Sequence, residues 1–279
     1  MTQPPSTIDA GSAQVFAALL EARTGQRIAA NRSWRYDAAL KPLMQSLSLD
    51  RIEQLTARLM DGQDAGLADR IVDALLNQET SFFRDTGVIE AAAKLVTDTP
   101  GATRVWCAAC ASGQEPLSLA MLFAEAGGTM PDIVATDVSA AAIQRARSGL
   151  YSQFEIQRGL PIRRMMQWFE AATENQWSAS SQLLAAIQYR RHNLVVDAPP
   201  IGGFDLILCR NVLFYLAPHI REQVLERLAG ALKPGGKLLL GAGETVIGQS
   251  DRLRPCAAAR GFYERSDAPG DPKRVYTAS

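Results

Sequence analysis

Few side chains in this sequence can do chemistry by themselves, and the clearest ones lie where predicted strands end. The stretch VWCAACASGQEPLSLAM, residues 105–121, is typical of a strand, a tight loop and a helix. Asp137 ends the next predicted strand, where a carboxylate can accept hydrogen bonds from both hydroxyls of a ribose. Small residues let a ligand come close to the backbone, and they fill the loop of the first stretch: Ala108, Ala109, Ala111, Ser112 and Gly113. Together the loop and the acid indicate a nucleoside-containing ligand.

Each of these features also has a plainer interpretation. The loop lacks the G-x-G-x-x-G pattern, which makes a dinucleotide pyrophosphate less favoured, and small residues can occur in a loop without any ligand. Asp137 could cap the helix that follows it, although Ser139 can provide that cap instead. Because the loop and the acid occur together, we favour a ligand site over both alternatives.

This chain contains few residues that could bind a metal ion or support catalysis by histidine. Only two histidines occur, His192 and His219, and they stand far apart with no metal-ligand spacing around either. Cys107 and Cys110 form a CxxC pair that could suggest zinc or redox chemistry, but no second CxxC exists. We therefore expect no metal site and interpret the two cysteines as small packing residues of the loop.

The composition describes a chain that can bury a core and carries no bulk charge. The 279 residues are 47% hydrophobic, with 29 basic and 29 acidic side chains. Nucleic-acid binding usually requires a basic excess, so we expect none here. We find neither a signal-peptide pattern nor 18 successive apolar residues, and therefore expect a cytoplasmic protein with reduced thiols and no membrane insertion.

The pattern of apolar residues along the chain changes once. Residues 1–14 are predicted to form a flexible tail, and residues 15–88 a helical N-terminal domain with a linker, because apolar residues recur three and four apart. From residue 89 to 279, short apolar runs alternate with helical stretches, which predicts an α/β fold with a parallel sheet. Residues 152–193 interrupt this alternation, and we interpret them as an insertion between the fourth and fifth strands of the sheet.

The C-terminal part of the chain indicates more specifically which α/β fold is present. GGFDLILCRNVLFYLAP, residues 202–218, is followed by a helix and by LKPGGKLLLGAGET, residues 232–245. The order of these elements is a strand that begins at Phe-Asp, then a helix, then a Lys-Pro-Gly-Gly turn that leads into another strand. This order resembles the second half of class I S-adenosylmethionine-dependent methyltransferases. The fold class implied is a Rossmann-like class I methyltransferase sheet with an N-terminal helical domain and a small β-subdomain insertion.

A narrower resemblance rests on four blocks in one order: NQETSFFRD, WCAACASGQEPLSLAM, ATDVSAAAIQRARSGLY and FDLILCRNVLFYL. The chain resembles CheR-type chemotaxis receptor methyltransferases over nearly its whole length. That family converts glutamates on the cytoplasmic domain of methyl-accepting chemotaxis receptors into methyl esters, with S-adenosylmethionine as the methyl donor and S-adenosylhomocysteine as the product. The resemblance implies that residues 172–193 form the small β-subdomain of this family. In some members this subdomain also binds a C-terminal receptor peptide, and whether this chain does so stays open.

The resemblance implies roles for particular residues. Arg84 would meet the substrate carboxylate as well as the cofactor region, and Tyr215 would face the transferred methyl. Phe82 and Phe83 would be packing residues in a linker that lines the site. The implied cofactor-binding residues are Gln78, Thr80, Arg84, Ala109, Gly113, Glu115, Asp137, Asn193, Leu194, Arg210 and Asn211.

The sequence departs from the family pattern at three places. Where the family usually has asparagine two residues before the threonine of the linker, this chain has Gln78, with Asn77 before it. The common acidic pair before the proline is Gln114-Glu115, which retains one acid. The familiar Gly-His-Ser-Glu near the end is GAGE, residues 241–244. These changes concern the cofactor contacts and leave the class of enzyme unaffected.

Carboxyl methylation fits this set of residues. A glutamate has an ordinary pKa of about 4.3 and is already an anion at neutral pH, so no general base is needed. The protein must align the reacting groups and limit the desolvation cost. The planar fork of Arg84 suits a carboxylate. Two alternatives remain: Arg84 could form a domain-linking salt bridge with Asp85 or a neighbouring residue, and Tyr215 could be a core aromatic.

Two other functions compete with this interpretation. One is a methyltransferase acting on nitrogen, on nucleic acid or on another protein target; the sequence CRNVLFY after the fourth motif strand and the neutral charge argue against nucleic acid. The other is a non-catalytic S-adenosylmethionine-binding scaffold, against which the retention of Arg84 and Tyr215 argues. The sequence names neither the receptor nor the pathway, and we expect a monomer.

Overall fold

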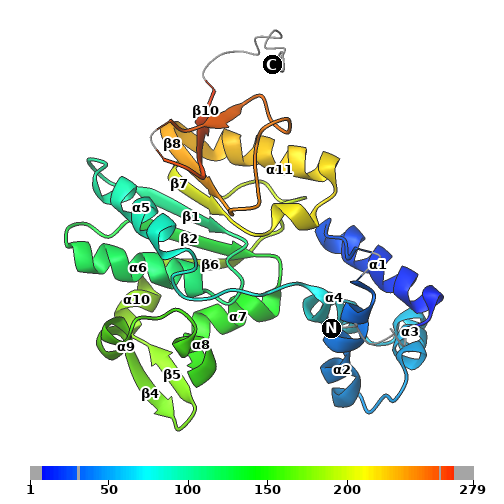
Figure 1. The fold of residues 1–279 in the computed structure, drawn as a ribbon. Helices are drawn as coiled ribbons and strands as arrows, with labels where there is room; N and C mark the ends of the chain where they lie inside the picture. The colour runs from blue at the N-terminus through cyan, green and yellow to red at the C-terminus, as the bar shows by residue number, and fades with distance from the viewer. Residues whose placement is uncertain (1–7, 30–31, 258, 267–279) are drawn as a thin grey trace, which may run out of the picture.

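Four helices open the chain and pack around their own apolar core (Figure 1). The computed structural model describes residues 8–29, 32–257 and 259–266. The core of this N-terminal part includes Phe16, Leu40, Leu55 and Ile71, all buried. The helices are α1 (Ala10–Thr24), α2 (Trp34–Ser46), α3 (Ile52–Asp61) and α4 (Leu67–Leu75).

The first helix begins earlier than expected. α1 starts at Ala10, because the Asp9 carboxylate accepts a hydrogen bond of 2.9 Å from the Ser12 amide and so caps the helix. The prediction of a flexible tail through residue 14 is therefore wrong for residues 10–14, while residues 1–7 lie outside the described part. The buried side chain of Ser12 shows that even the first turn packs against its neighbours.

The main sheet has seven strands in the order β6-β2-β1-β7-β8-β10-β9. The first five are parallel, and β10 and β9 are antiparallel at one edge. This arrangement confirms the predicted α/β fold class. The strands are β1 (Arg104–Ala108), β2 (Asp132–Asp137), β6 (Ile187–Arg191), β7 (Phe204–Cys209), β8 (Leu232–Leu240), β9 (Leu253–Pro255) and β10 (Phe262–Arg265).

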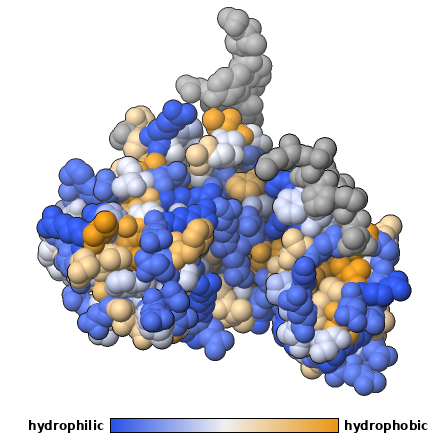
Figure 2. All heavy atoms as spheres, turned by 60° about the horizontal axis from the view of Figure 1, so that its bottom comes forward, coloured by the Kyte–Doolittle hydropathy of each residue, from blue (hydrophilic) through white to orange (hydrophobic). Residues whose placement is uncertain are grey.

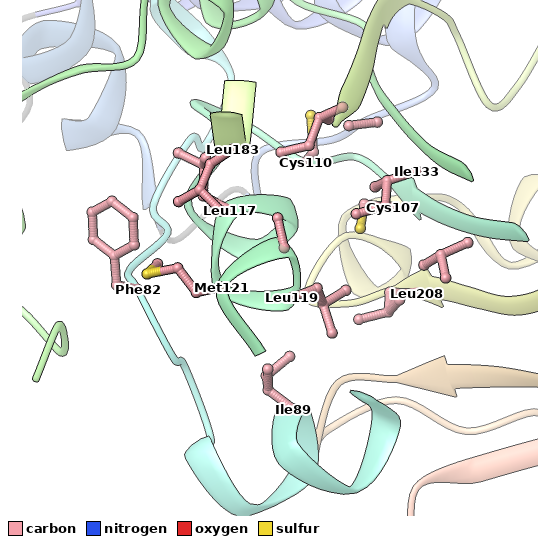
Figure 3. Close-up of a cluster of buried hydrophobic side chains, with 14 of the residues drawn as sticks. Phe82, Ile89, Cys107, Cys110, Leu117, Leu119, Met121, Ile133, Leu183 and Leu208 are labelled. Carbon is pink, nitrogen blue, oxygen red and sulfur yellow. The ribbon is translucent and has the colours of Figure 1, made fainter. Parts of the chain in front are cut away.

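Helices cover both faces of the main sheet. One face carries a core formed with α5 (Thr86–Thr97), α6 (Gln114–Ala126) and α7 (Ala140–Ser148), and Figure 3 shows part of it. The other face packs against α11 (Pro218–Ala231). Ile89 of α5 is buried in the first of these cores, so α5 belongs with the sheet. The predicted boundary between residues 88 and 89 is therefore wrong, because it cuts this helix.

A second, antiparallel sheet of three strands lies in the order β3-β5-β4. It confirms the predicted small β-subdomain but corrects its limits of 172–193. β3 begins at Leu150, and β6 belongs to the main sheet, where it pairs with β2. The insertion precedes β6 and so lies between the second and third strands of the main sheet along the chain. Its elements are β3 (Leu150–Ser152), α8 (Gln153–Gln157), α9 (Ile162–Trp168), β4 (Phe169–Thr173), β5 (Gln176–Ala179) and α10 (Ser181–Ala185).

The linker between α4 and α5 joins all three parts of the molecule. Phe82 is fully buried, and its ring meets those of Tyr151 and Phe169 edge-on, with centroids 5.0 and 5.5 Å apart. A Cβ on Gly159 would lie 2.2 Å from the Phe82 carbonyl oxygen, so the subdomain approaches the linker as closely as glycine allows. The linker is thus held in place by the small sheet and by the main core.

The surface of the face drawn in Figure 2 is mainly hydrophilic, with scattered apolar residues, over both the helical lobe and the larger sheet-bearing part. Within the described residues, no helix is both long and apolar enough to cross a membrane.

Candidate active site

A pocket with about 1000 Å³ of empty space, part of which is open to solvent, lies where the linker crosses the carboxyl ends of the parallel strands. Its walls are the linker at 76–81 and 83–84, the loop after β1 at 109–111, and the segments after β2, β6 and β7. The remaining lining residues are Thr24 and Gln26 at the end of α1, Ile89 of α5, and Glu115 and Ser118 of α6. The carboxyl edge of an open parallel sheet is the usual place for a ligand.

The structure brings together all of the site residues named from the sequence except one. Gly113 does not line the cavity. The others surround it: Gln78, Thr80, Arg84, Ala109, Glu115, Asp137, Asn193, Leu194, Arg210, Asn211 and Tyr215. Their separate roles in binding and catalysis stay predictions.

Gly113 has a packing position. It precedes α6 with φ of +91°, and a Cβ there would lie 2.9 Å from the Ala146 Cβ and 3.0 Å from the Tyr189 hydroxyl. α6 can therefore approach α7 and β6 only because residue 113 has no side chain. The sequence indicated a small residue correctly, but the contact that requires it is helix packing.

Gly113→Ala is expected to lower the free energy of unfolding by about 2–4 kcal/mol, since it adds a left-handed backbone cost to a steric overlap. Urea denaturation of both proteins measures this loss. Gly128→Ala is the matched control, because Gly128 also has φ of +91° but no atom within 4 Å of its Cβ position. We expect the control to lose only about 1 kcal/mol. Equal losses in the two variants would rule out the packing explanation.

The cavity walls contain strained backbone. Ala109, Ala111 and Asn211 have φ of +61°, +48° and +61°, and Phe83 of the linker has φ of +50°. Each costs about 1–2 kcal/mol for an L-residue and persists only when its surroundings hold it. The loop after β1 is held because the Cys110 amide donates to the Thr136 carbonyl at 2.9 Å. Such clustered strain is typical of functional sites.

Asp137 is buried at the tip of β2 and holds two loops together. Its Oδ2 accepts from the Ala111 amide and its Oδ1 from the Ser139 amide, both at 2.9 Å. Ser139 caps α7 by accepting from the Ala142 amide, so the capping alternative for Asp137 is not needed. Each carboxylate oxygen has a further lone pair, which leaves capacity for two hydroxyl donors. Burial raises the pKa of Asp137 above its ordinary value, while the two backbone N–H groups lower it.

Arg210 is the most buried charge of the site, with a side chain only 2% exposed. It donates to Glu115 at 2.9 Å and to Asp85 at 2.5 Å, and more weakly to the Arg84 carbonyl at 3.3 Å. Burial raises the pKa of Glu115, and Arg210 opposes this rise. The cluster ties the loop after β7 to α6 and to the linker.

Arg84 does not form an ion pair with Asp85, the partner that the alternative interpretation named for it. Asp85 pairs with Arg210, so the alternative of a salt bridge between Arg84 and Asp85 is not supported. Arg84 is half-buried and donates from Nη1 to the Glu79 carbonyl at 3.2 Å. Glu79 itself forms an ion pair with Arg158 of the subdomain, 2.5 Å apart. No carboxylate among the described residues lies within ion-pair distance of Arg84, which leaves its fork available to a ligand.

Glu244 supports the loop after β7, and sequence reasoning missed it. One carboxylate oxygen accepts from the amides of Asn211 and Gly241, both at 2.8 Å. The other accepts from Val212 and Leu213 at 2.9 and 2.7 Å. The GAGE block was the available signal, but it was treated only as a departure from a family pattern. Glu244 fixes the turn that carries Asn211 and the short 3-10 helix η2 (Leu213–Tyr215).

Tyr215 is half-buried and lines the cavity, with its ring centroid 4.3 Å from that of Phe214, so it is not a buried core aromatic.

Asn193 donates to the Arg23 carbonyl at 2.7 Å and so ties the segment after β6 to the end of α1. His192, which spacing had set aside, also lines the cavity; its Nε2 lies 2.9 Å from the Ala198 carbonyl, and its buried Nδ1 has no partner.

The cysteines do not supply chemistry to the cavity. Cys107 and Cys110 are free thiols, and they lie within the apolar cluster of Figure 3. Burial raises the pKa of Cys107, Cys110 and Cys209 well above the ordinary value, which disfavours the reactive thiolate. No group of three or more potential metal ligands is present in the described residues.

The chain is similar to known proteins over nearly its whole length. Residues 78–262 match the family described as CheR methyltransferase, SAM binding domain. The chain is 32% identical to chemotaxis protein methyltransferase 1 of Pseudomonas aeruginosa over 266 residues, which cover 91% of this chain and 97% of the relative. It is 34% identical to the chemotaxis protein methyltransferase of Vibrio parahaemolyticus over 248 residues, 85% of this chain and 90% of that one. The chain therefore belongs to the CheR methyltransferase family of S-adenosylmethionine-dependent enzymes.

Proposed function

We propose that this protein transfers the methyl group of S-adenosylmethionine to glutamate side chains in the cytoplasmic domain of a chemoreceptor, and that the cavity described above holds both reactants. The family match extends over the sheet and the linker. The observation that carries the residue-level proposal is the cavity itself, which gathers Asp137, the Glu115–Arg210 pair, Arg84 and Tyr215 around one space. A receptor substrate of this kind also implies a cytoplasmic reaction.

The cofactor fits the residues on one side of the cavity. Ala109 and Ala111 carry no bulk, and Asp137 retains two lone pairs for a ribose. Asn193 and Leu194 line the adenine side, and Glu115 lines the cavity with its charge balanced by Arg210. When bound, S-adenosylmethionine supplies a sulfonium that makes its methyl group electrophilic. The protein residues then have to bind, orient and exclude water.

The other side of the cavity suits a carboxylate that is already ionised. Arg84 can hold one carboxylate oxygen through its fork, and the Tyr215 hydroxyl can donate a hydrogen bond beside it. These contacts orient the glutamate side chain of the substrate, while its second carboxylate oxygen remains free to attack the methyl group. No proton has to be removed, because glutamate ionises near pH 4.3 and the reaction runs at about neutral pH. The partly apolar walls, such as Leu216 and Val212, reduce hydration of the nucleophile.

The test uses S-adenosylmethionine labelled with tritium in the methyl group, together with membranes that contain the cognate receptor. Mild base hydrolyses methyl esters and releases volatile methanol, whereas methylated nitrogen retains its label. We expect volatile counts from the wild-type protein. Stable counts would move the target to nitrogen, and tight cofactor binding without any counts would favour the scaffold alternative.

The pH dependence of cofactor binding tests the role of Asp137. Its pKa is raised by burial in the free protein, and two ribose hydroxyl donors favour the ionised form, so binding lowers that pKa. The affinity for S-adenosylhomocysteine should therefore be full above the raised pKa and fall as the pH drops through it. Calorimetric titration across pH 5–8 measures this, and Asp137→Asn should bind about 10- to 100-fold more weakly at neutral pH with a flatter profile. Because Glu115 also has a raised pKa, some slope should remain until Glu115→Gln is added. An unchanged profile in Asp137→Asn would contradict the assignment.

We further propose that the free edge of β4 receives a receptor tail peptide. The order β3-β5-β4 leaves one side of β4 without a neighbouring strand in the described structure. Such an edge can bind an extended peptide by strand addition. Titration with a peptide of the receptor C-terminus should show binding that Ala171→Pro abolishes, because Ala171 lies within β4. Binding that survives this change would place the peptide elsewhere.

A further inference from the structure

The hydroxyl of Tyr215 receives a hydrogen bond from a residue that no family pattern identified. The Nδ2 of Asn77 donates to the Tyr215 Oη, although the two residues are 138 positions apart. Asn77 lies in the linker after α4, and both side chains line the cavity. Asn77 stands one position before Gln78.

The backbone on both sides of this contact is held in place. The Arg27 amide donates to the Tyr215 carbonyl at 2.9 Å, and Gln26 forms an antiparallel bridge with Leu216. On the linker side, Leu76 is buried, and the Gln78 Nε2 donates to the Ser139 hydroxyl at 3.0 Å. The segments that carry Asn77 and Tyr215 are therefore docked independently of the hydrogen bond between them.

The direction of this hydrogen bond determines where the tyrosine proton points. An amide N–H uses a lone pair of the hydroxyl oxygen, so the hydroxyl must direct its own proton elsewhere. Donation to that oxygen also polarises the hydroxyl and makes it a stronger donor. Among the hydrogen bonds of the described residues, none has the Tyr215 hydroxyl as its donor. The proton is thus free for an acceptor in the cavity.

We propose that Asn77 is a positioning residue, which orients the Tyr215 hydroxyl so that it donates to the substrate carboxylate. This inference rests on the proposed function, because it requires a carboxylate substrate next to Tyr215. It assigns to the N-terminal part of the chain a direct influence on the methyl-transfer pocket, through the linker and through the contact of Gln26 and Arg27 with η2.

The test is a double-mutant cycle on receptor methylation, with Asn77→Ala, Tyr215→Phe and the double variant. We expect Asn77→Ala to lower kcat/KM about 3- to 10-fold, the range for one neutral hydrogen bond. In the Tyr215→Phe background the same change should have no further effect. The affinity for S-adenosylhomocysteine should stay within about twofold throughout, which separates positioning from a loss of folding or cofactor binding.

Asn77→Asp adds a control of the same shape. A carboxylate accepts the tyrosine proton and turns it away from the substrate, so this variant should lose more activity than Asn77→Ala. Part of the loss comes from repulsion of the substrate carboxylate, and only this part should persist in the Tyr215→Phe background.

The possible failures are distinguishable. If Tyr215→Phe has wild-type activity, the proposed role of Tyr215 and this inference are both wrong. If Tyr215→Phe is impaired while Asn77→Ala causes its full loss independently, only the positioning role of Asn77 is overturned. An Asn77→Ala protein with wild-type kcat/KM would also overturn it.

Discussion

Arg84→Ala is expected to reduce kcat/KM for receptor methylation by about 100- to 1,000-fold, as removing one partner of a desolvated charge pair does. Arg84 has a backbone contact to Glu79 but no carboxylate within ion-pair distance in the described residues. Its fork is therefore available, and its loss should affect substrate binding more than folding. The release of volatile methanol from labelled receptor measures the effect. The affinity for S-adenosylhomocysteine should change less than about tenfold, because Asp137 and the other proposed cofactor contacts are retained in this variant.

Two variants sharpen this prediction. Arg84→Lys keeps the charge but loses the planar fork, so an intermediate activity would show that geometry matters as well as charge. Arg158→Ala removes a nearby exposed arginine that pairs with Glu79, and it should reduce activity far less. If Arg84→Ala retains activity within about threefold of wild type, a substrate role for this residue is excluded.

Arg210→Met is expected to lower the free energy of unfolding by about 3–5 kcal/mol and to abolish cofactor binding. The substitution leaves the buried carboxylate of Glu115 without its cation and frees Asp85 from the loop after β7. Because burial already raises the pKa of Glu115, removal of Arg210 should raise it further, and the destabilisation should be greatest above that pKa. Urea denaturation at pH 7.5 and at pH 5 measures the stability loss and its pH dependence, and calorimetric titration with S-adenosylhomocysteine measures the loss of cofactor binding.

The matched control is Arg252→Met, which breaks an exposed pair with Glu226 at 3.7 Å and should change stability by less than about 1 kcal/mol. Adding Glu115→Gln to Arg210→Met should restore part of the stability, since the uncompensated charge is then removed. It should not restore activity. A stability loss in Arg210→Met as small as that of the control would mean that the cluster is not a structural element of the site.

Local sequence patterns predicted those elements of the fold whose signal comes from residues close together in the chain. The buried strands read as short apolar runs because a parallel sheet is covered on both faces, and β1, β2 and β7 were predicted at their places. Asp137 was found because the end of a strand is visible in the sequence. The helical N-terminal part was visible from its three- and four-residue periodicity.

Short and weakly patterned elements could not be predicted at their correct limits. β3 has three residues, too few for any alternation to be recognised, so the subdomain was begun too late. α1 begins at a cap, Asp9, in a polar stretch that resembles a tail. β6 was assigned to the insertion because only the partner strand β2 identifies it as part of the main sheet.

The sequence by itself determined the fold class, the family resemblance and most residues that surround the cavity, because these follow from local periodicity and from motifs within short segments. Only the tertiary structure decided which charges pair. Asp85 binds Arg210 and leaves Arg84 free, Glu244 accepts from three amides of the loop after β7, and Asn77 meets Tyr215. These contacts join residues from tens to more than a hundred positions apart, and their geometry depends on how the linker crosses the sheet. Spacing along the chain carries no information about such pairings, so the contact of Asn77 with Tyr215 became visible only in the folded molecule. The same holds for the close packing of other elements around Gly113.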